Sequence, residues 1–249
     1  MKFLENSLVD SNTFIKPQLP FMPGLVAGVS LRQHGNMRLG PNGAPIDSIA
    51  RACFALEIGA SPERVVCPIL VHGNEVARVS GSDLENALEV DGLVTDEPGL
   101  FLSVTAADCA PVFFIDTEKR IVGIAHAGWR GLLRGVIQSV VNEMKAMGSD
   151  TGKIHAFVGP VIGVCHFEVG MQVAEQFRVH LGTDVLSRRE GKIFVDLKKS
   201  AQRLLGRAGV SPGNIKTSEI CTFCDERCFS SRRDGADGLQ TMMGIIGIE

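Results

Sequence analysis

The chain has 249 residues, of which 45% are hydrophobic and 21% charged, and its formal net charge at pH 7 is -3. This length and balance predict a globular protein of one large or two small domains and exclude a general attraction to nucleic acid or anionic membranes. No apolar run is long enough to span a membrane, and the first residues lack the apolar centre of a secretory signal. We therefore expect a cytoplasmic protein whose seven cysteines are reduced thiols.

Apolar, β-branched runs bounded by Gly, Pro or charged residues predict strands along the whole chain. In chain order these runs are residues 24–31, 65–71, 76–79, 101–105, 112–115, 121–125, 154–158, 192–196, 215–220 and 242–248. Apolar residues at helical spacing predict helices between Asp47 and Gly59 and over residues 132–147, 170–181 and 197–208. Several strands follow one another across short turns, so the order favours an α/β fold with mixed sheets and helices outside.

The stretch from Ser103 to Gly131 carries the most reactive residues. Its pattern predicts three strands in succession. A polar tip follows the first strand, a turn follows the second, and a second polar tip follows the third. Cys109, preceded by Asp108, stands at the first tip, and His126 stands at the second. The predicted strand over residues 65–71 delivers His72 in the same way. We therefore expect three strand ends to bring one thiol and two imidazoles together.

Two imidazoles and one thiolate are a recognised ligand set for catalytic zinc, which keeps a fourth position open. Asp108 is then a candidate to orient one of these ligands through a hydrogen bond, without binding the metal itself. The same residues also suit nucleophilic catalysis, with Cys109 as the nucleophile, His126 as the base, and Asp108 or Asn74 orienting the imidazole. A third interpretation is that the side chains are unrelated. The sequence does not distinguish the zinc site from the nucleophilic thiol, because both interpretations need a deprotonated thiol beside histidine.

Arginines follow predicted strand ends or face Gly-rich turns at several places. A guanidinium group there can bind phosphate through two hydrogen bonds. As a set these residues indicate an anionic ligand, although each one alone is equally typical of a solvated surface. The candidates are Arg32, Arg51, Arg130, Arg232 and Arg233.

Cys221, Cys224 and Cys228 lie close together in the sequence. A closed zinc site needs four ligands, and no fourth Cys or His stands nearby. Cys165 and His166 reach the three cysteines only if the chain folds back. We therefore predict free thiols and no metal site in this segment.

Several motifs resemble those of the YfiH-like family, long labelled multicopper polyphenol oxidases or laccase-domain proteins. They are HGNEV at residues 72–76, TAADCAPVFFID at 105–116 and IAHAGWRG at 124–131. GPVIGVCHFEVG at 159–170 and CTFCDERCFSSRRDG at 221–235 resemble two further family segments. The resemblance therefore covers most of the chain and implies a single YfiH-like domain over residues 1–249.

The resemblance implies a layered α/β-β/α fold with mixed sheets, related to the catalytic domain of a bacterial deamidating toxin. It places the family's metal ligands on His72, Cys109 and His126. Members are described as purine nucleoside phosphorylases acting on adenosine, inosine and methylthioadenosine, with adenosine deaminase activity, and some as peptidoglycan editing factors. The implied function is a zinc enzyme acting on a purine nucleoside and phosphate. The alternatives are a Cys109–His126 amide hydrolase that edits a cell-wall precursor, and a non-enzymatic partner protein that keeps the metal site.

The chain departs from the family pattern in segments associated with substrate contacts. Ile69-Leu70-Val71 stand where Gln is usual before His72, and of a Thr-Arg-x-Gly-Gly segment only Arg32 and Gly35 remain. Gly238-Leu239 lacks the arginine of a late Gly-Arg pair. A multicopper oxidase needs several copper centres built largely from imidazoles. Six histidines are too few for them, so we expect zinc rather than copper.

Overall fold

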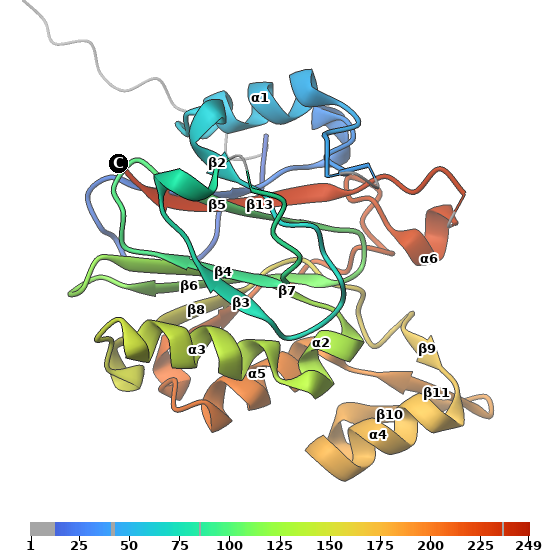
Figure 1. Cartoon of the computed structure of the whole chain (residues 1–249). Coiled ribbons are helices and arrows are strands. Elements are labelled where there is room, and N and C mark those ends of the chain that lie inside the picture. Colours follow the sequence, from blue (N-terminus) through green and yellow to red (C-terminus); the bar gives the residue numbers. More distant parts are fainter. Residues whose placement is uncertain (1–12, 41–42, 85, 236) are drawn as a thin grey trace, which may run out of the picture.

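The computed structural model describes residues 13–40, 43–84, 86–235 and 237–249. Two sheets lie face to face in these residues (Figure 1). The four-stranded sheet has the order β1 (Leu25–Val29), β13 (Met242–Ile248), β5 (Phe101–Ala106), β2 (Val65–Val66). The six-stranded sheet has the order β12 (Ile215–Thr217), β8 (His155–Val158), β6 (Ala110–Asp116), β7 (Ile121–Ala127), β4 (Gly92–Thr95), β3 (Val76–Arg78).

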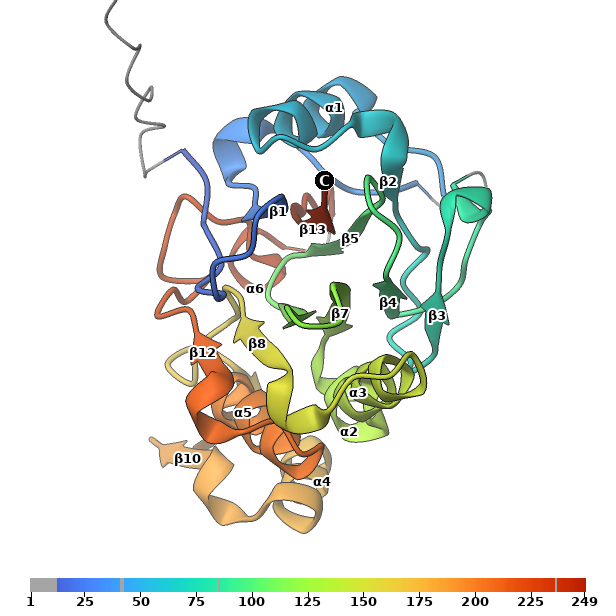
Figure 2. The same cartoon turned by 90° about the vertical axis from the view of Figure 1, so that its left-hand side faces the viewer.

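Helices cover the outer faces of both sheets (Figure 2). The four-stranded sheet is covered by α1 (Ser48–Glu57), and the six-stranded sheet by α2 (Trp129–Arg134), α3 (Val136–Ala146) and α5 (Leu197–Arg207). A small third sheet extends to one side and consists of β10 (Leu186–Arg189), β11 (Lys192–Val195) and β9 (Glu168–Val169), with α4 (Met171–Leu181) packed beside it. The short α6 (Ser231–Asp234) follows in the C-terminal loop. No helix in the described residues is long and apolar enough to cross a membrane.

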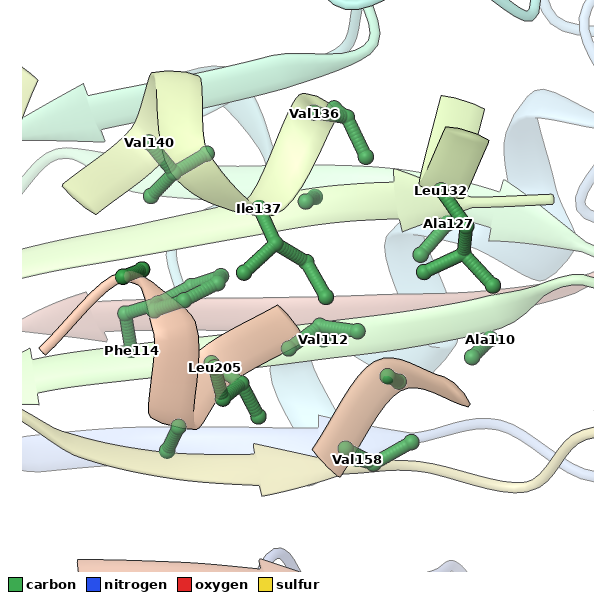
Figure 3. Close-up of a cluster of buried hydrophobic side chains, with 14 of the residues drawn as sticks. Ala110, Val112, Phe114, Ala127, Leu132, Val136, Ile137, Val140, Val158 and Leu205 are labelled. Carbon is green, nitrogen blue, oxygen red and sulfur yellow. The ribbon is translucent and has the colours of Figure 1, made fainter. Parts of the chain in front are cut away.

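Three apolar layers hold this arrangement together. Phe113 and Ile246 belong to the central layer between the two sheets. A second layer fills the space between the six-stranded sheet and its helices, where Val112 and Ile137 face each other (Figure 3). Phe54 of α1 packs on the outer face of the four-stranded sheet and forms the third. The predicted α/β class with layered, mixed sheets is confirmed, since parallel and antiparallel pairs occur in both large sheets.

Strand β6 shows how the sequence specifies these layers. Its side chains alternate, so that Val112 and Phe114 face the helices, whereas Phe113 and Ile115 face the other sheet. All seven of its residues are buried. A strand buried on both faces reads as a continuous apolar run, which is why its position was clear from the sequence.

The predicted strand over residues 65–71 is wrong beyond Val66, and this changes the setting of His72. Pro68 has no amide hydrogen to donate to a sheet. The amides of His72 and Gly73 instead donate to the side chain of Asp91. His72 therefore lies in a turn rather than at a strand end.

The predicted helix over residues 132–147 is also corrected. It begins earlier, at Trp129, and it is divided into two helices at Gly135. The φ of Gly135 is 94°, a left-handed conformation that glycine adopts without a Cβ clash. Strands β4, β9 and β10 were not predicted, because their sequences GLVT, EV and LSRR contain at most two consecutive apolar residues. The helix that follows Asp47 is confirmed, and the Asp47 side chain accepts the amide hydrogen of Ala50.

Phe114→Ala should destabilise the layer between the six-stranded sheet and its helices. Phe114 is fully buried there (Figure 3), so the truncation should lower the free energy of unfolding by about 3–5 kcal/mol. Urea denaturation measures the change. Phe21 is 91% exposed, so Phe21→Ala is a matched control that should change the value by less than about 0.5 kcal/mol. Equal losses in both variants would contradict this packing.

Candidate metal centre

His72, Cys109 and His126 converge at one end of the six-stranded sheet. One ligand atom from each lies within 4.8 Å of the others, and the two imidazole rings stand edge to face with centroids 4.9 Å apart. Cys109 lies in the turn where the chain crosses from the four-stranded sheet to the six-stranded one. The pairing of β6 with β7 sets Ala110 opposite Ala127, and this register brings His126 to the same end.

Asp91, which directly precedes β4, holds the two histidines in place. Its Oδ1 lies 2.9 Å from Nδ1 of His126 and accepts the amide hydrogen of His72 at 3.0 Å. Its Oδ2 accepts the amide hydrogen of Gly73 at 2.6 Å. A carboxylate at Nδ1 keeps the proton there and leaves Nε2 as the lone-pair nitrogen. Sequence reasoning missed Asp91, although an acidic residue directly before a buried run was a usable signal.

Asp108 does not orient a histidine, which corrects the role predicted for it. Its Oδ1 accepts the hydroxyl hydrogen of Thr222 at 2.6 Å, and its Oδ2 accepts the amide hydrogen of Arg232 at 2.7 Å. Its φ is 86°, and that of His72 is 57°. Such left-handed backbone is uncommon outside glycine and clusters at functional sites. Asp108 thus ties the C-terminal loop to the turn that carries Cys109.

Gly128 allows the turn after His126 to approach the thiol. A Cβ atom at this position would lie 2.7 Å from Sγ of Cys109, a distance that no side chain tolerates without displacement. The absence of a side chain therefore serves the geometry of the three ligands.

The thiol and the imidazole of this site perturb each other. Burial raises the pKa of Cys109, but the charge of His126 and the hydrogen bonds from both histidines lower it to about 6. Burial lowers the pKa of His126, but Cys109 and Asp91 raise it to about 10. Burial likewise raises the pKa of Asp91, and the hydrogen bonds from His126 and Gly73 bring it below its ordinary value. A thiolate beside an imidazolium results, and a metal ion would replace the shared proton.

The three ligands open into a cavity of 430 Å³. Its lining is mostly aliphatic and comes from four loops and the ends of β5 and β7. The cavity is lined, besides the ligands, by Arg38, Leu39, Gly40, Pro68, Ile69, Leu70, Thr105, Ala106, Ala107, Leu239 and Thr241. Arg38 is the one arginine among these described lining residues, and its guanidinium donates to the carbonyl of Leu239 at 3.4 Å. Sequence reasoning missed Arg38, which lies in an irregular loop.

The five predicted arginines lie outside the described lining of this cavity. Three of them hold the C-terminal loop. Arg32 pairs with Asp234 at 2.5 Å, Arg232 donates to the carbonyl of Glu168 at 3.0 Å, and Arg233 donates to the carbonyls of Thr222 and Phe223 at 2.9 Å each.

The other two predicted arginines face separate hollows. The buried Arg51 donates to the carbonyl of Met37 and lines an adjoining cavity of 490 Å³. The guanidinium of Arg130 lies 4.3 Å from the ring centroid of Trp129, in a third hollow beside α4. Asn74 follows Gly73 in the turn after His72, while Asp91 has the orienting role considered for it.

A second group of ligand atoms lies in a different place. Cys165, His166, Cys221 and Cys224 each bring one ligand atom within 4.8 Å of the others. The chain does fold back between these segments, so the reason for predicting no metal site there is wrong. Cys228 is fully buried and is not part of the group.

Comparison with known proteins gives concordant relatives. Residues 42–249 match the family model described as multi-copper polyphenol oxidoreductase laccase. Adenosine deaminase RL5, from an unknown prokaryotic organism, is 36% identical over 209 residues, which cover 79% of this chain and 80% of that protein. Purine nucleoside phosphorylase YlmD of Geobacillus stearothermophilus is 34% identical over 254 residues, 92% of each protein.

Solved structures agree with these relatives. The crystal structure of YlmD from Geobacillus stearothermophilus aligns with a TM-score of 0.85 and 31% identity, over 96% of this chain and 97% of that one. The structure of Bacillus licheniformis YfiH aligns with a TM-score of 0.79 and 30% identity, over 90% and 93%. Sequence, fold and the Cys/His cluster lead to one conclusion: this chain belongs to the YfiH-like family.

Proposed function

We propose that this protein is a zinc enzyme that cleaves purine nucleosides with phosphate and also deaminates adenosine. The observation that carries the proposal is the opening of His72, Cys109 and His126 into a cavity that has aliphatic walls and one arginine. The names of two relatives, purine nucleoside phosphorylase and adenosine deaminase, support the choice of substrate.

The donor set of the three residues fits zinc better than copper. Two imidazoles and one thiolate, with ligand atoms within 4.8 Å of one another, suit one tetrahedral ion with an open position. Multicopper oxidation needs several adjacent centres. The Cys/His groups in the described residues contain only three histidines, His72, His126 and His166. When bound, zinc would supply Lewis-acid activation of water or of a substrate oxygen.

The remaining residues bind and position the substrates. The cavity volume of 430 Å³ lies within the range of about 300–1,000 Å³ typical of small-molecule sites. Ile69, Leu70 and Leu239 offer apolar surface to a purine and its ribose. The guanidinium of Arg38 attracts phosphate and can hold two of its oxygens. Asp91 keeps the proton on Nδ1 of His126.

Two reactions fit this arrangement. In phosphorolysis a phosphate oxygen attacks the anomeric carbon of the ribose, and the bond to the purine nitrogen breaks. Its electron pair leaves with the base, which then takes a proton. In deamination water attacks the purine C6 carbon and ammonia leaves. Phosphate is consumed only in the first reaction, so the products separate the two.

Amide hydrolysis is a second candidate, and the thiolate–imidazolium pair favours it. Cys109 would attack a carbonyl carbon, and His126 would give its proton to the leaving amine. The cell-wall precursor considered above is a substrate of this class. Because a metal ligand has its sulfur lone pair engaged, the two roles of Cys109 respond differently to alkylating reagents.

Metal-loaded protein should release adenine and ribose 1-phosphate from adenosine only when phosphate is present, and should form inosine without it. Chelation should abolish both reactions, since each depends on the ion at the three ligands. Chromatography of the products with and without phosphate, before and after chelation, measures this.

Two outcomes would contradict the proposal. One is the absence of both base release and inosine from metal-loaded protein, which also leaves the non-enzymatic alternative standing. The other is stoichiometric alkylation of Cys109 at a rate that chelation leaves unchanged, together with amide hydrolysis, which would identify a nucleophilic thiol.

Cys109→Ala should lose about one zinc ion per chain, because a His-Cys-His site cannot hold the ion with two ligands.

Asp91→Asn should retain the ligands but bind that same ion about 10–100-fold more weakly, since its amide positions His126 poorly. Competition with a chelator measures the affinity. Asp116 is also buried and accepts two amide hydrogens in the distant β6–β7 turn, so Asp116→Asn is a matched control. Equal weakening in both would exclude a specific role for Asp91.

Arg38→Ala should raise the KM for phosphate at least about 10-fold, because a charged hydrogen bond contributes about 1.5–3 kcal/mol. The KM for the nucleoside should change much less. Steady-state kinetics with each substrate varied in turn measures both. Arg78 pairs with Asp96 on the exposed surface, so Arg78→Ala is the control. An unchanged KM for phosphate would remove Arg38 from the phosphate site.

A further inference from the structure

The group formed by Cys165, His166, Cys221 and Cys224, here called the Cys3His cluster, lies outside the site described above. Cys165 and His166 belong to the loop between β8 and β9, and the other two cysteines to the loop between β12 and α6. We propose that the Cys3His cluster is a closed site for one zinc ion that joins these two loops. The proposal does not depend on the enzyme's reaction.

The separations of the ligand atoms are those of a tetrahedral site. Sγ of Cys165 lies 3.5 Å from Sγ of Cys221 and 3.7 Å from Sγ of Cys224. Sγ of Cys224 lies 3.3 Å from Nδ1 of His166. Zinc with sulfur at about 2.3 Å and nitrogen at about 2.0 Å holds two sulfurs roughly 3.8 Å apart and a sulfur and a nitrogen roughly 3.5 Å apart. A disulfide would need its sulfurs at about 2.0 Å.

The backbone around the Cys3His cluster is shaped to receive the sulfurs. A Cβ atom at Gly163 would lie 2.9 Å from Sγ of Cys165 and 3.2 Å from Sγ of Cys221, so a side chain there would displace them. The amide of Gly163 donates to Sγ of Cys221 at 3.1 Å. The ring of His166 stacks on Phe223 with centroids 3.9 Å apart, which fixes the direction of its nitrogens. These contacts orient the ligands as outer contacts do in metal sites.

Two arginines bind the backbone that carries the ligands. Three thiolates and a neutral imidazole around a divalent ion carry a net charge of -1. Arg189 donates to the carbonyls of Val164 and Cys165 at 2.8 and 3.0 Å. Arg233 donates to carbonyls on the other loop, between Cys221 and Cys224. Guanidinium groups this close to the ligand-bearing backbone stabilise a negative complex.

The number of ligands separates this site from the first one. Four protein ligands leave no position for a substrate and are typical of structural zinc, whereas three ligands leave one open. The ion would fix the loop that carries Thr222 and leads into α6. Thr222 and the amide of Arg232 in α6 both bind Asp108, next to Cys109. The Cys3His cluster would therefore stabilise the C-terminal loop rather than take part in catalysis.

Metal analysis of the full chain, purified under reducing conditions, tests the proposal. Wild type should hold about two zinc ions per chain, and Cys224→Ser and Cys109→Ala should each hold about one. Cys224 is exposed, so its replacement disturbs little packing. Cys53 is an exposed thiol on α1 outside both groups, and Cys53→Ser should keep both ions. Cys224→Ser should also have a lower Tm than Cys53→Ser.

Cobalt substitution adds a direct test of the ligands. Cobalt-loaded Cys109→Ala should show thiolate-to-cobalt absorption, which should disappear when Cys224→Ser is added. Equal zinc contents in wild type and Cys224→Ser would overturn the proposal, as would iron in place of zinc. A Cys165–Cys221 disulfide without a second zinc ion would overturn it too. If Cys224→Ser fails to fold, the zinc contents of wild type and Cys109→Ala still decide. About one zinc ion in wild type and none in Cys109→Ala would exclude a zinc ion in the Cys3His cluster.

Discussion

The carboxylate of Asp91 is the group on which the first site depends. It is fully buried, and a buried carboxylate is strongly unfavourable unless charged and polar partners surround it. Those partners are the ring of His126 and the amides of His72 and Gly73. The same contacts close the turn that leaves the sheet after β2 and keep its amides hydrogen-bonded. Folding of this turn and alignment of the two histidines therefore depend on the same side chain.

Asp108 connects the first site to the Cys3His cluster. Its left-handed backbone conformation turns the chain from β5 into β6 and sets the direction of Cys109. That conformation is unfavourable by itself, and the bonds to Thr222 and Arg232 compensate for it. Thr222 belongs to the loop that also carries Cys221 and Cys224, and Arg232 belongs to α6, which follows this loop. A metal ion in the Cys3His cluster would therefore act on the position of the Cys109 thiol through a short chain of contacts.

How much was predictable depended on whether the signal was local. The apolar runs of β5, β6 and β7 predicted that Cys109 and His126 lie near strand ends, because neighbouring residues determine the burial of a strand. Cys109 lies in the turn after β5, and His126 lies inside β7, next to its last residue. Asp91 was not predicted as a site residue because β4, which follows it, contains only two consecutive apolar residues, Leu93 and Val94, and was not predicted as a strand. The Cys3His cluster depends on the parallel bridge between Val161 and Cys221, a tertiary contact across some sixty residues with no local pattern. His72 was predicted as a ligand from an expected strand end, and the resemblance to the family implied the same ligand, but the predicted strand end proved to be a turn.

Arg38 explains how the cavity keeps a positive charge despite the sequence departure at Leu239. The resemblance described in the sequence analysis implies an arginine where this chain has Leu239, and an anion in an aliphatic cavity needs a charged partner. Arg38 comes from a loop near the other end of the chain, and its guanidinium donates to the main-chain carbonyl of Leu239. A carbonyl is supplied by any residue, so this contact positions the guanidinium without requiring a particular side chain at 239. The cation is thus retained in the cavity while the side chain that carries it comes from a different loop.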